Sequence, residues 1–161
     1  MSCISIRRMN NAAASERDAV IRRWARKADA DLRNAEHTLT LGEDCPLDTV
    51  GFHAQQCAEK YLKALLVAYD LPVPRIHDVR KLAQLLSASD ALPTEIDTLA
   101  LNDLTAYAVD SRYPDDDEEP LDRMTVEAAV LVAKQVRTAV RAVVLVHTAL
   151  TEVNSHQPRL L

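Results

Sequence analysis

Apolar residues recur every three or four positions along most of the chain, the spacing that places them on one face of an α-helix. A first helix is predicted over about residues 15–41, with Ser15 as its N-cap and Gly42 just after its end. Its apolar stripe consists of Val20, Trp24, Ala28, Leu32, Ala35 and Leu39. Its opposite face is basic, with Arg22, Arg23, Arg26, Lys27 and Arg33.

The same spacing predicts four more helices. A second helix spans about residues 49–69, and the proline-containing segment after it is a stiff connection. Asp78 is the expected N-cap of a short third helix, a fourth helix starts near Pro93, and the last helix spans about residues 121–152. Three long helices and a short pair between them indicate an all-α, up-and-down antiparallel bundle.

Segments that lack this spacing set the expected domain limits. Residues 1–14 are predicted to be a flexible tail, residues 15–153 a single helical domain, and residues 154–161 a frayed tail. Residues 111–120 hold two prolines and a run of five acidic side chains, which is typical of an exposed loop. Clustered carboxylates in a loop are usually solvated, so no metal site is expected there and no cofactor is predicted.

Composition narrows the class of protein. The chain has 161 residues, which suits one domain. It has 2 glycines, where average usage would give about eleven, and this argues against a sheet-rich fold. A net charge of −5 argues against nucleic-acid binding through bulk charge. With no long apolar run, no secretory signal and three cysteines in no known motif, we expect reduced thiols, no membrane contact and a cytoplasmic location.

Three groups of polar residues are candidates for chemistry. Gln56, Glu59, Lys60 and Lys63 are spaced by three and four, so they share one side of the second helix. His77 and Asp78 precede the third helix, where an imidazole can meet an anion or a carboxylate. Arg112 and Tyr113, followed by a proline, suit a phosphate or carboxylate. Each group also has a structural interpretation, as an interhelical clasp, a helix cap or a contact at the end of the bundle.

Several of these motifs together resemble the HEPN domain family of small helical nucleotide-binding proteins. The resemblance rests on the Trp24-Ala and Asp31-Leu pairs, the block FHAQQCAEKYLKALL from Phe52 to Leu66, His77-Asp-Val-Arg-Lys-Leu82 and Arg112-Tyr-Pro-Asp115. It covers about residues 20–150. It implies a bundle of about five helices that commonly forms homodimers. Many bacterial members pair with a minimal nucleotidyltransferase, some as toxin and antitoxin.

The wider superfamily includes metal-independent ribonucleases, whose motif is an arginine and a histidine separated by four to six residues. Arg141 and His147 fit this spacing, and they would serve as phosphate stabiliser and as general acid or base. Ala142 and Ala149 depart from the polar residue and the tyrosine common at those positions. On an ideal helix Arg141 and His147 point about 240° apart, so a kink or a dimer would have to bring them together.

The sequence therefore predicts a HEPN-domain protein that binds a nucleotide such as ATP or GTP, or acts as the toxin-like partner of a minimal nucleotidyltransferase. The residues expected to bind the nucleotide or another anion are Gln56, Glu59, Lys60, Lys63, His77, Asp78, Arg112 and Tyr113. Two alternatives remain open. One is a metal-independent ribonuclease that uses Arg141 and His147 on RNA, and the other is a non-catalytic bundle for protein interaction.

Overall fold

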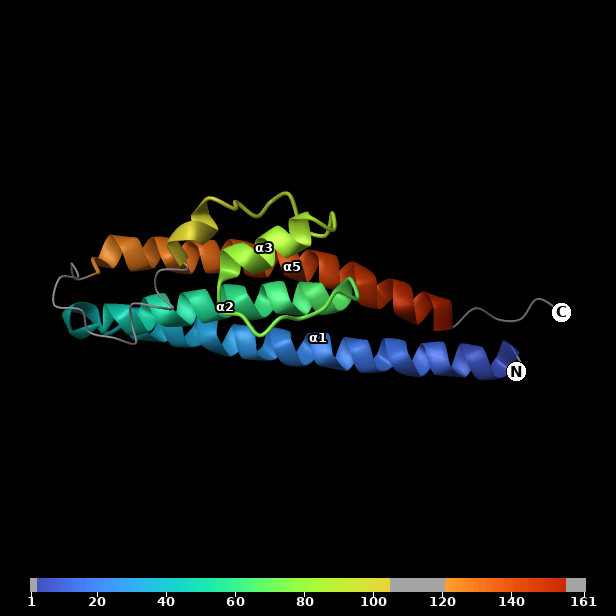
Figure 1. Cartoon of the computed structure of the whole chain (residues 1–161). Helices are drawn as coiled ribbons and strands as arrows, with labels where there is room; N and C mark the ends of the chain where they lie inside the picture. Colours follow the sequence, from blue (N-terminus) through green and yellow to red (C-terminus); the bar gives the residue numbers. More distant parts are fainter. Residues whose placement is uncertain (1–2, 105–120, 156–161) are drawn as a thin grey trace.

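The protein is a bundle of three long helices with a short helical layer on one side (Figure 1). The structure, a computed structural model, describes residues 3–104 and 121–155, with side chains described for 13–104 and 121–146. The long helices are α1 (Cys3–Leu39), α2 (Leu47–Ala68) and α5 (Arg123–Ser155). The short elements are the 3-10 helix η1 (Gly42–Asp44), α3 (Val79–Ser87) and a helical segment at 100–104. The described residues contain no strand, and the predicted all-α fold is confirmed.

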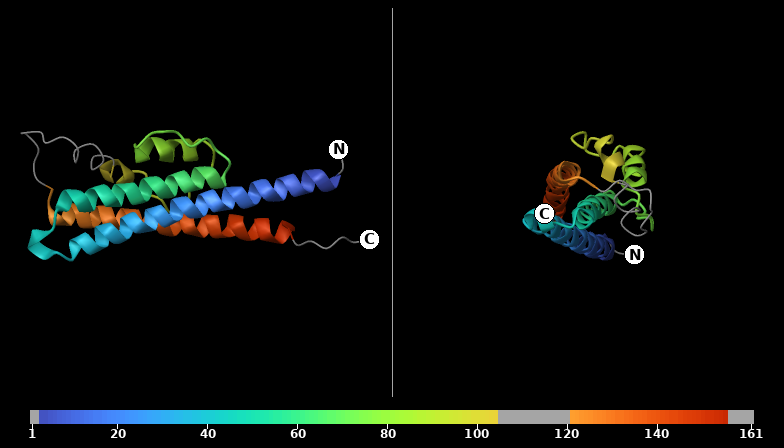
Figure 2. Two further views of the ribbon diagram at one scale, coloured as in Figure 1. Left: turned by 90° about the horizontal axis from the view of Figure 1, so that it is seen from below. Right: turned by 90° about the vertical axis from the view of Figure 1, so that its left-hand side faces the viewer.

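Helix α2 is the central element of the bundle. It contacts α1, α3 and α5, and the end-on view in Figure 2 shows it between them. Most of its side chains are buried, among them Tyr61, Leu62 and Leu65. Ala28 and Ala35 of α1 are fully buried against this core, and small residues there let the helices approach closely. The buried polar residues of α2, namely Gln55, Glu59 and Lys63, therefore need partners inside the protein.

Arg123, at the start of α5, holds the connection between α1 and α2 in place. Gly42 adopts a left-handed backbone conformation with φ of 65°, as predicted for the residue after a helix. The Arg123 guanidinium donates to the carbonyl oxygens of Leu39 and Gly42. The last carbonyls of a helix have no partner within it, so at Leu39 the guanidinium completes the end of α1. The Gly42 carbonyl lies beyond that end and also accepts from the N–H of Cys45.

Three predicted boundaries were wrong. Helix α1 begins at Cys3, so residues 3–14, expected to be a tail, are helical; this stretch is alanine-rich and contains no helix breaker. Pro93 does not start a helix: turns continue to residue 99, and the Asp97 carboxylate accepts from the N–H of Leu99 (2.8 Å), just before the segment at 100–104. Helix α5 begins at Arg123 rather than at residue 121, since Asp122 accepts from the N–H of Thr125.

Helices α1 and α5 continue beyond the end of α2. Ile21 of α1 packs against Ala64 and Ala68 in the last turns of α2, and Val144 of α5 packs against the same group. The preceding residues of α1 and the following residues of α5 therefore run past α2, as both views of the ribbon show (Figures 1 and 2). This end of the molecule is a pair of helices rather than a three-helix bundle.

Candidate functional site

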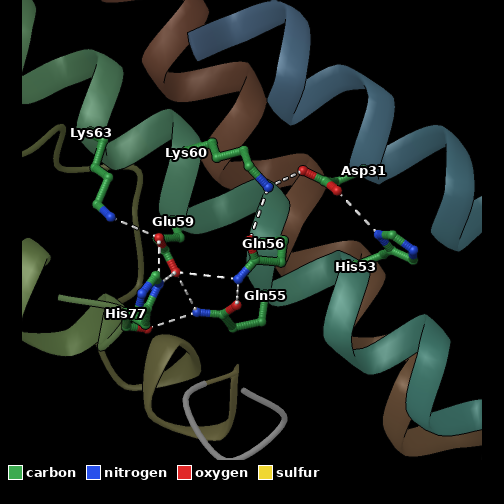
Figure 3. A network of polar contacts seen from close by, with 8 residues as sticks. All are labelled: Asp31, His53, Gln55, Gln56, Glu59, Lys60, Lys63 and His77. Atoms are coloured by element: carbon green, nitrogen blue, oxygen red, sulfur yellow. Dashed lines mark hydrogen bonds and ion pairs between the residues drawn. The ribbon is translucent and has the colours of Figure 1, made fainter. Parts of the chain in front are cut away.

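A buried carboxylate on α2 forms the centre of the first polar group, which we call the Glu59 cluster: Gln55, Glu59, Lys63 and His77 (Figure 3). Lys63 Nζ donates to Glu59 Oε1 at 2.8 Å, and the two side chains are only 6% and 4% exposed. Gln55 donates to Glu59 Oε2 at 3.1 Å and to the backbone carbonyl of His77 at 2.8 Å. The cluster thus ties α2 to the segment that leads into α3.

The hydrogen bonds of the cluster keep Glu59 ionised. Burial would raise the pKa of this carboxyl, but the hydrogen bonds from Lys63 and Gln55 outweigh burial, so the pKa lies below its ordinary value. Lys63 Nζ also lies 5.8 Å from the ring centroid of Trp24, within reach of a cation–π contact. Every buried polar side-chain atom in the described residues has a hydrogen-bond partner. The interior of the cluster is therefore satisfied by the protein itself.

His77 is the member of the cluster that reaches water. Its side chain is 62% exposed, while its Nδ1 lies 3.2 Å from Glu59 Oε1. An ionised carboxylate only accepts hydrogen bonds, so Nδ1 carries the hydrogen in this contact. Asp78 fixes the backbone beside it, because its carboxylate accepts from the N–H groups of Arg80 and Lys81 at the start of α3. The predicted N-cap at Asp78 is confirmed.

A second polar group lies on the neighbouring side of α2. Lys60 Nζ forms an ion pair with Asp31 of α1 and donates to Gln56 Oε1 at 2.9 Å. His53 Nδ1 lies 3.1 Å from the other oxygen of Asp31. Gln56 also donates to Gln55 Oε1 at 2.8 Å, so it links this group to the Glu59 cluster. Lys60 and His53 thus join α2 to α1, and Gln56 connects Lys60 with the Glu59 cluster.

A third polar group, the Asp29 junction, joins the three long helices. Asp29 of α1 accepts from Tyr61 of α2 at 2.6 Å, and from Arg137 at 2.7 Å and Arg141 at 2.9 Å on α5. Burial acts to raise the pKa of Asp29, but the hydrogen bonds from Tyr61 and Arg137 outweigh burial and lower it. Burial, and then the contact with Asp29, raise the pKa of the Tyr61 hydroxyl. Two guanidiniums share one carboxylate, so this junction has surplus positive charge.

The sequence of this chain matches the family model of the HEPN domain over residues 21–143. This chain belongs to the HEPN domain family.

One solved structure similar to this HEPN domain is the crystal structure of TT1696 from Thermus thermophilus. The two chains share 28% sequence identity with a TM-score of 0.60. The match covers 76% of this chain and 96% of that chain. No curated protein matches this chain.

The HEPN domain brings together only part of the predicted site. Glu59, Lys63, His77 and Asp78 lie within one cluster and its adjoining helix cap. Gln56 donates to Gln55 and to Glu59 at the edge of this cluster, and Lys60 lies beside it and contacts Asp31 of α1. Arg112, Tyr113 and the acidic run fall outside the described residues. Arg141 contacts Asp29, and His147 lies in α5 with its side chain outside the description. The interpretation of the α2 row as an interhelical clasp is therefore the one that its contacts match.

Sequence reasoning missed Gln55, Asp29 and Arg137 as members of these groups. Gln55 lies next to the predicted row, and a glutamine in a helix this apolar was itself a signal of a buried partner. Asp29 and Arg137 are 108 residues apart, and no local spacing relates them. The described residues hold no cluster of side chains suited to a metal ion. None of the described helices has an apolar stretch of the length that crossing a bilayer requires.

Proposed function

We propose that this HEPN-domain protein binds a nucleotide, such as ATP or GTP, at the exposed edge of the Glu59 cluster, and that it acts as the toxin-like partner of a minimal nucleotidyltransferase. The observation that carries the binding site is His77, which is fixed by Glu59 through Nδ1 and presents an exposed imidazole. Exposed cationic side chains surround it in sequence, at Arg75, Arg80 and Lys81. Such a group is suited to phosphate oxygens.

In this proposal the interior of the cluster supports the site and does not itself bind phosphate. Lys63 is buried on Glu59, so the phosphate would meet His77 and the first turn of α3. Asp78 offsets part of the local charge through its contacts with Arg80 and Lys81. The expected ligand therefore has a compact anionic group, and its affinity falls as salt rises.

A thermal-shift measurement with ATP, GTP, ADP and AMP, each with and without Mg²⁺, tests the binding site. A ligand at 100 times its Kd adds about 2.7 kcal/mol of stability. For a domain of this size that corresponds to a rise in Tm of about 5–10 °C. His77→Ala should abolish the shift, while the matched variant His37→Ala, at an exposed position near the end of α1, should keep it. An absent shift with every nucleotide, or equal shifts in both variants, would refute nucleotide binding here and favour the non-catalytic bundle.

The partner is tested separately. Co-expression with a minimal nucleotidyltransferase encoded beside this chain should yield a complex on size-exclusion chromatography and relieve any growth arrest that this chain causes alone. A homodimer is also expected, and exposed apolar side chains of α5, such as Met124 and Leu131, support it. Light scattering should then give about twice the chain mass of 17.9 kDa. A mass equal to one chain would refute the dimer.

One observation favours a second candidate function, a metal-independent ribonuclease. The Arg141 side chain is 46% exposed although it contacts Asp29, so a phosphate could reach it. Arg141→Ala and His147→Ala should each abolish RNA cleavage while the chain stays folded. Arg137→Ala is the matched control, because it removes another guanidinium from the same carboxylate. If both motif variants cleave RNA like the wild type, the activity belongs to a contaminant or to another site.

A further inference from the structure

A groove runs between α1 and α5 near the point where α2 ends. It has a volume of about 540 Å³. Its apolar lining includes Ile21, Ala25 and Val144, and its charged lining consists of Arg22, Arg26, Arg141 and Asp29. The groove therefore combines an apolar floor with walls that carry mostly positive charge.

The positive charge of this groove is not neutralised within the described part of the chain. Asp29 is the one carboxylate of the lining, and Arg137 and Arg141 already occupy its two oxygens. Arg22 and Arg26 are exposed and form no ion pair with any described residue. A ligand that brings carboxylates to this pair would gain charge-assisted hydrogen bonds, which are stronger than neutral ones.

The groove lies beside the last turns of α2, because Asp29 contacts Tyr61 and Ile21 packs against Ala64 and Ala68. Beyond Ala68, α1 and α5 run on without that helix. Leu145 and Val146 stand 65% and 59% exposed where α5 leaves α2. Apolar side chains next to unoccupied space between two helices suit a further helix, which would extend the three-helix packing.

We propose that this α1–α5 groove docks an acidic amphipathic helix of a partner protein, with its apolar face on Ala25, Val144 and Leu145 and its carboxylates on Arg22 and Arg26. This inference rests on the protein partnership in the proposed function and names the surface and chemistry of that contact. The lining residues that the structure describes include no aromatic ring on which a nucleic-acid base could stack, and they favour a protein helix over RNA.

The test uses a fluorescent synthetic helix of about 18 residues, with leucines at i, i+3, i+4 and i+7 and glutamates at the remaining positions. Fluorescence anisotropy should show binding to the full chain. A scrambled peptide of the same composition should bind at least about tenfold more weakly, because its apolar residues no longer share a face. Equal binding of the two peptides would overturn the proposal, since charge alone would then explain the contact.

Two variants of equal charge locate the contact. Arg22→Glu/Arg26→Glu should weaken binding at least about tenfold. Arg23→Glu/Arg33→Glu changes the charge identically at exposed positions outside the groove lining, and it should bind like the wild type. A peptide with lysines in place of the glutamates should bind the first variant and not the second. The proposal is wrong if the two variants lose affinity equally.

Three further measurements show whether another molecule occupies the groove, or separate this inference from the proposed function. Groove-dependent binding of a single-stranded RNA in place of the acidic peptide would overturn it in favour of nucleic acid. A fall to monomer mass in light scattering for Arg22→Glu/Arg26→Glu alone would overturn it in favour of a second copy of this chain. The nucleotide-dependent rise in Tm should be unchanged in that variant, because His77 is not in the groove. For the wild-type chain, a nucleotide-dependent rise in Tm without any peptide binding refutes the groove alone, and peptide binding without any rise in Tm refutes only nucleotide binding.

Discussion

The Glu59 cluster and the Asp29 junction are both built on a carboxylate shared between two basic side chains, but water reaches them differently. Glu59 and Lys63 are 4% and 6% exposed, and His77 alone extends outward. At the junction Asp29 is 20% exposed, while Arg137 and Arg141 are 38% and 46% exposed. The same kind of contact thus occurs once inside the core and once at the surface.

This difference in exposure indicates which of the two polar groups a ligand can rearrange. Removing one partner of a buried pair leaves an uncompensated charge in a poorly solvated place, which is costly. At a partly exposed pair, water replaces the missing partner at little cost. The Glu59 cluster is therefore expected to stay intact when a ligand binds at His77, whereas Arg141 can exchange Asp29 for a ligand carboxylate or phosphate.

The largest expected effect is that of Glu59→Ala. It leaves the Lys63 ammonium buried without a counter-ion, and we expect a loss of about 3 kcal/mol in the free energy of unfolding, measured by urea titration. The double variant Glu59→Leu/Lys63→Met should recover most of this loss, because an apolar pair needs no partner. If the double variant is as unstable as the single one, the unpaired charge of Lys63 is not the cause of the loss.

Asp29→Ala should have a smaller effect, about 1.5 kcal/mol in the same titration, although it removes three hydrogen bonds. The two guanidiniums remain hydrated, and only the Tyr61 hydroxyl is left in a less exposed position. A loss as large as that of Glu59→Ala would contradict the distinction between the buried Glu59 cluster and the partly exposed Asp29 junction.

Asp78→Ala should cost about 1 kcal/mol, the usual contribution of an N-cap. It loosens the start of α3 without altering the Glu59–Lys63 pair. The nucleotide-dependent rise in Tm should shrink in this variant, since His77 is then held less firmly. An undiminished rise would mean that the position of His77 does not depend on the cap.

The smallest effect is the response to mild acid. The pKa values of Glu59 and Asp29 in the folded protein lie below their ordinary values of 4.5 and 3.8, so their ionised forms stabilise the fold. That contribution is complete above the ordinary values and is lost as pH falls through the lowered ones. Unfolding free energy should be nearly flat from about pH 7 to 5 and then decline. Glu59→Gln should remove part of that decline, and a decline of unchanged size would mean that other carboxylates cause it.

The fold could be predicted from sequence because it depends on local periodicity. The apolar spacing and scarce glycine identified the helices, and Asp78 identified the start of α3. Errors occurred where the local signal was ambiguous. Pro93 suits the first turn of a helix, but the Asp97 side chain satisfies the turn that follows, and the helical segment begins later.

Only part of the candidate site could be predicted from the sequence. Glu59 and Lys63 are four residues apart on one helix, so their pairing follows from spacing alone. The contact between His77 and Glu59 needs the path of the connection between α2 and α3, and Asp29 meets Arg141 across 112 residues. Contacts of that range are fixed by how the helices pack, which one periodic pattern does not specify.

The unequal lengths of the helices also decide how this protein can be handled in the laboratory. Helix α1 starts at Cys3 and α5 finishes at Ser155 on the same end of the molecule (Figures 1 and 2). That end is also the open side of the α1–α5 groove. A tag on either terminus would be attached at this end, so an acidic epitope could compete for Arg22 and Arg26. Interaction assays should use protein from which the tag has been cleaved, or a tag inserted elsewhere.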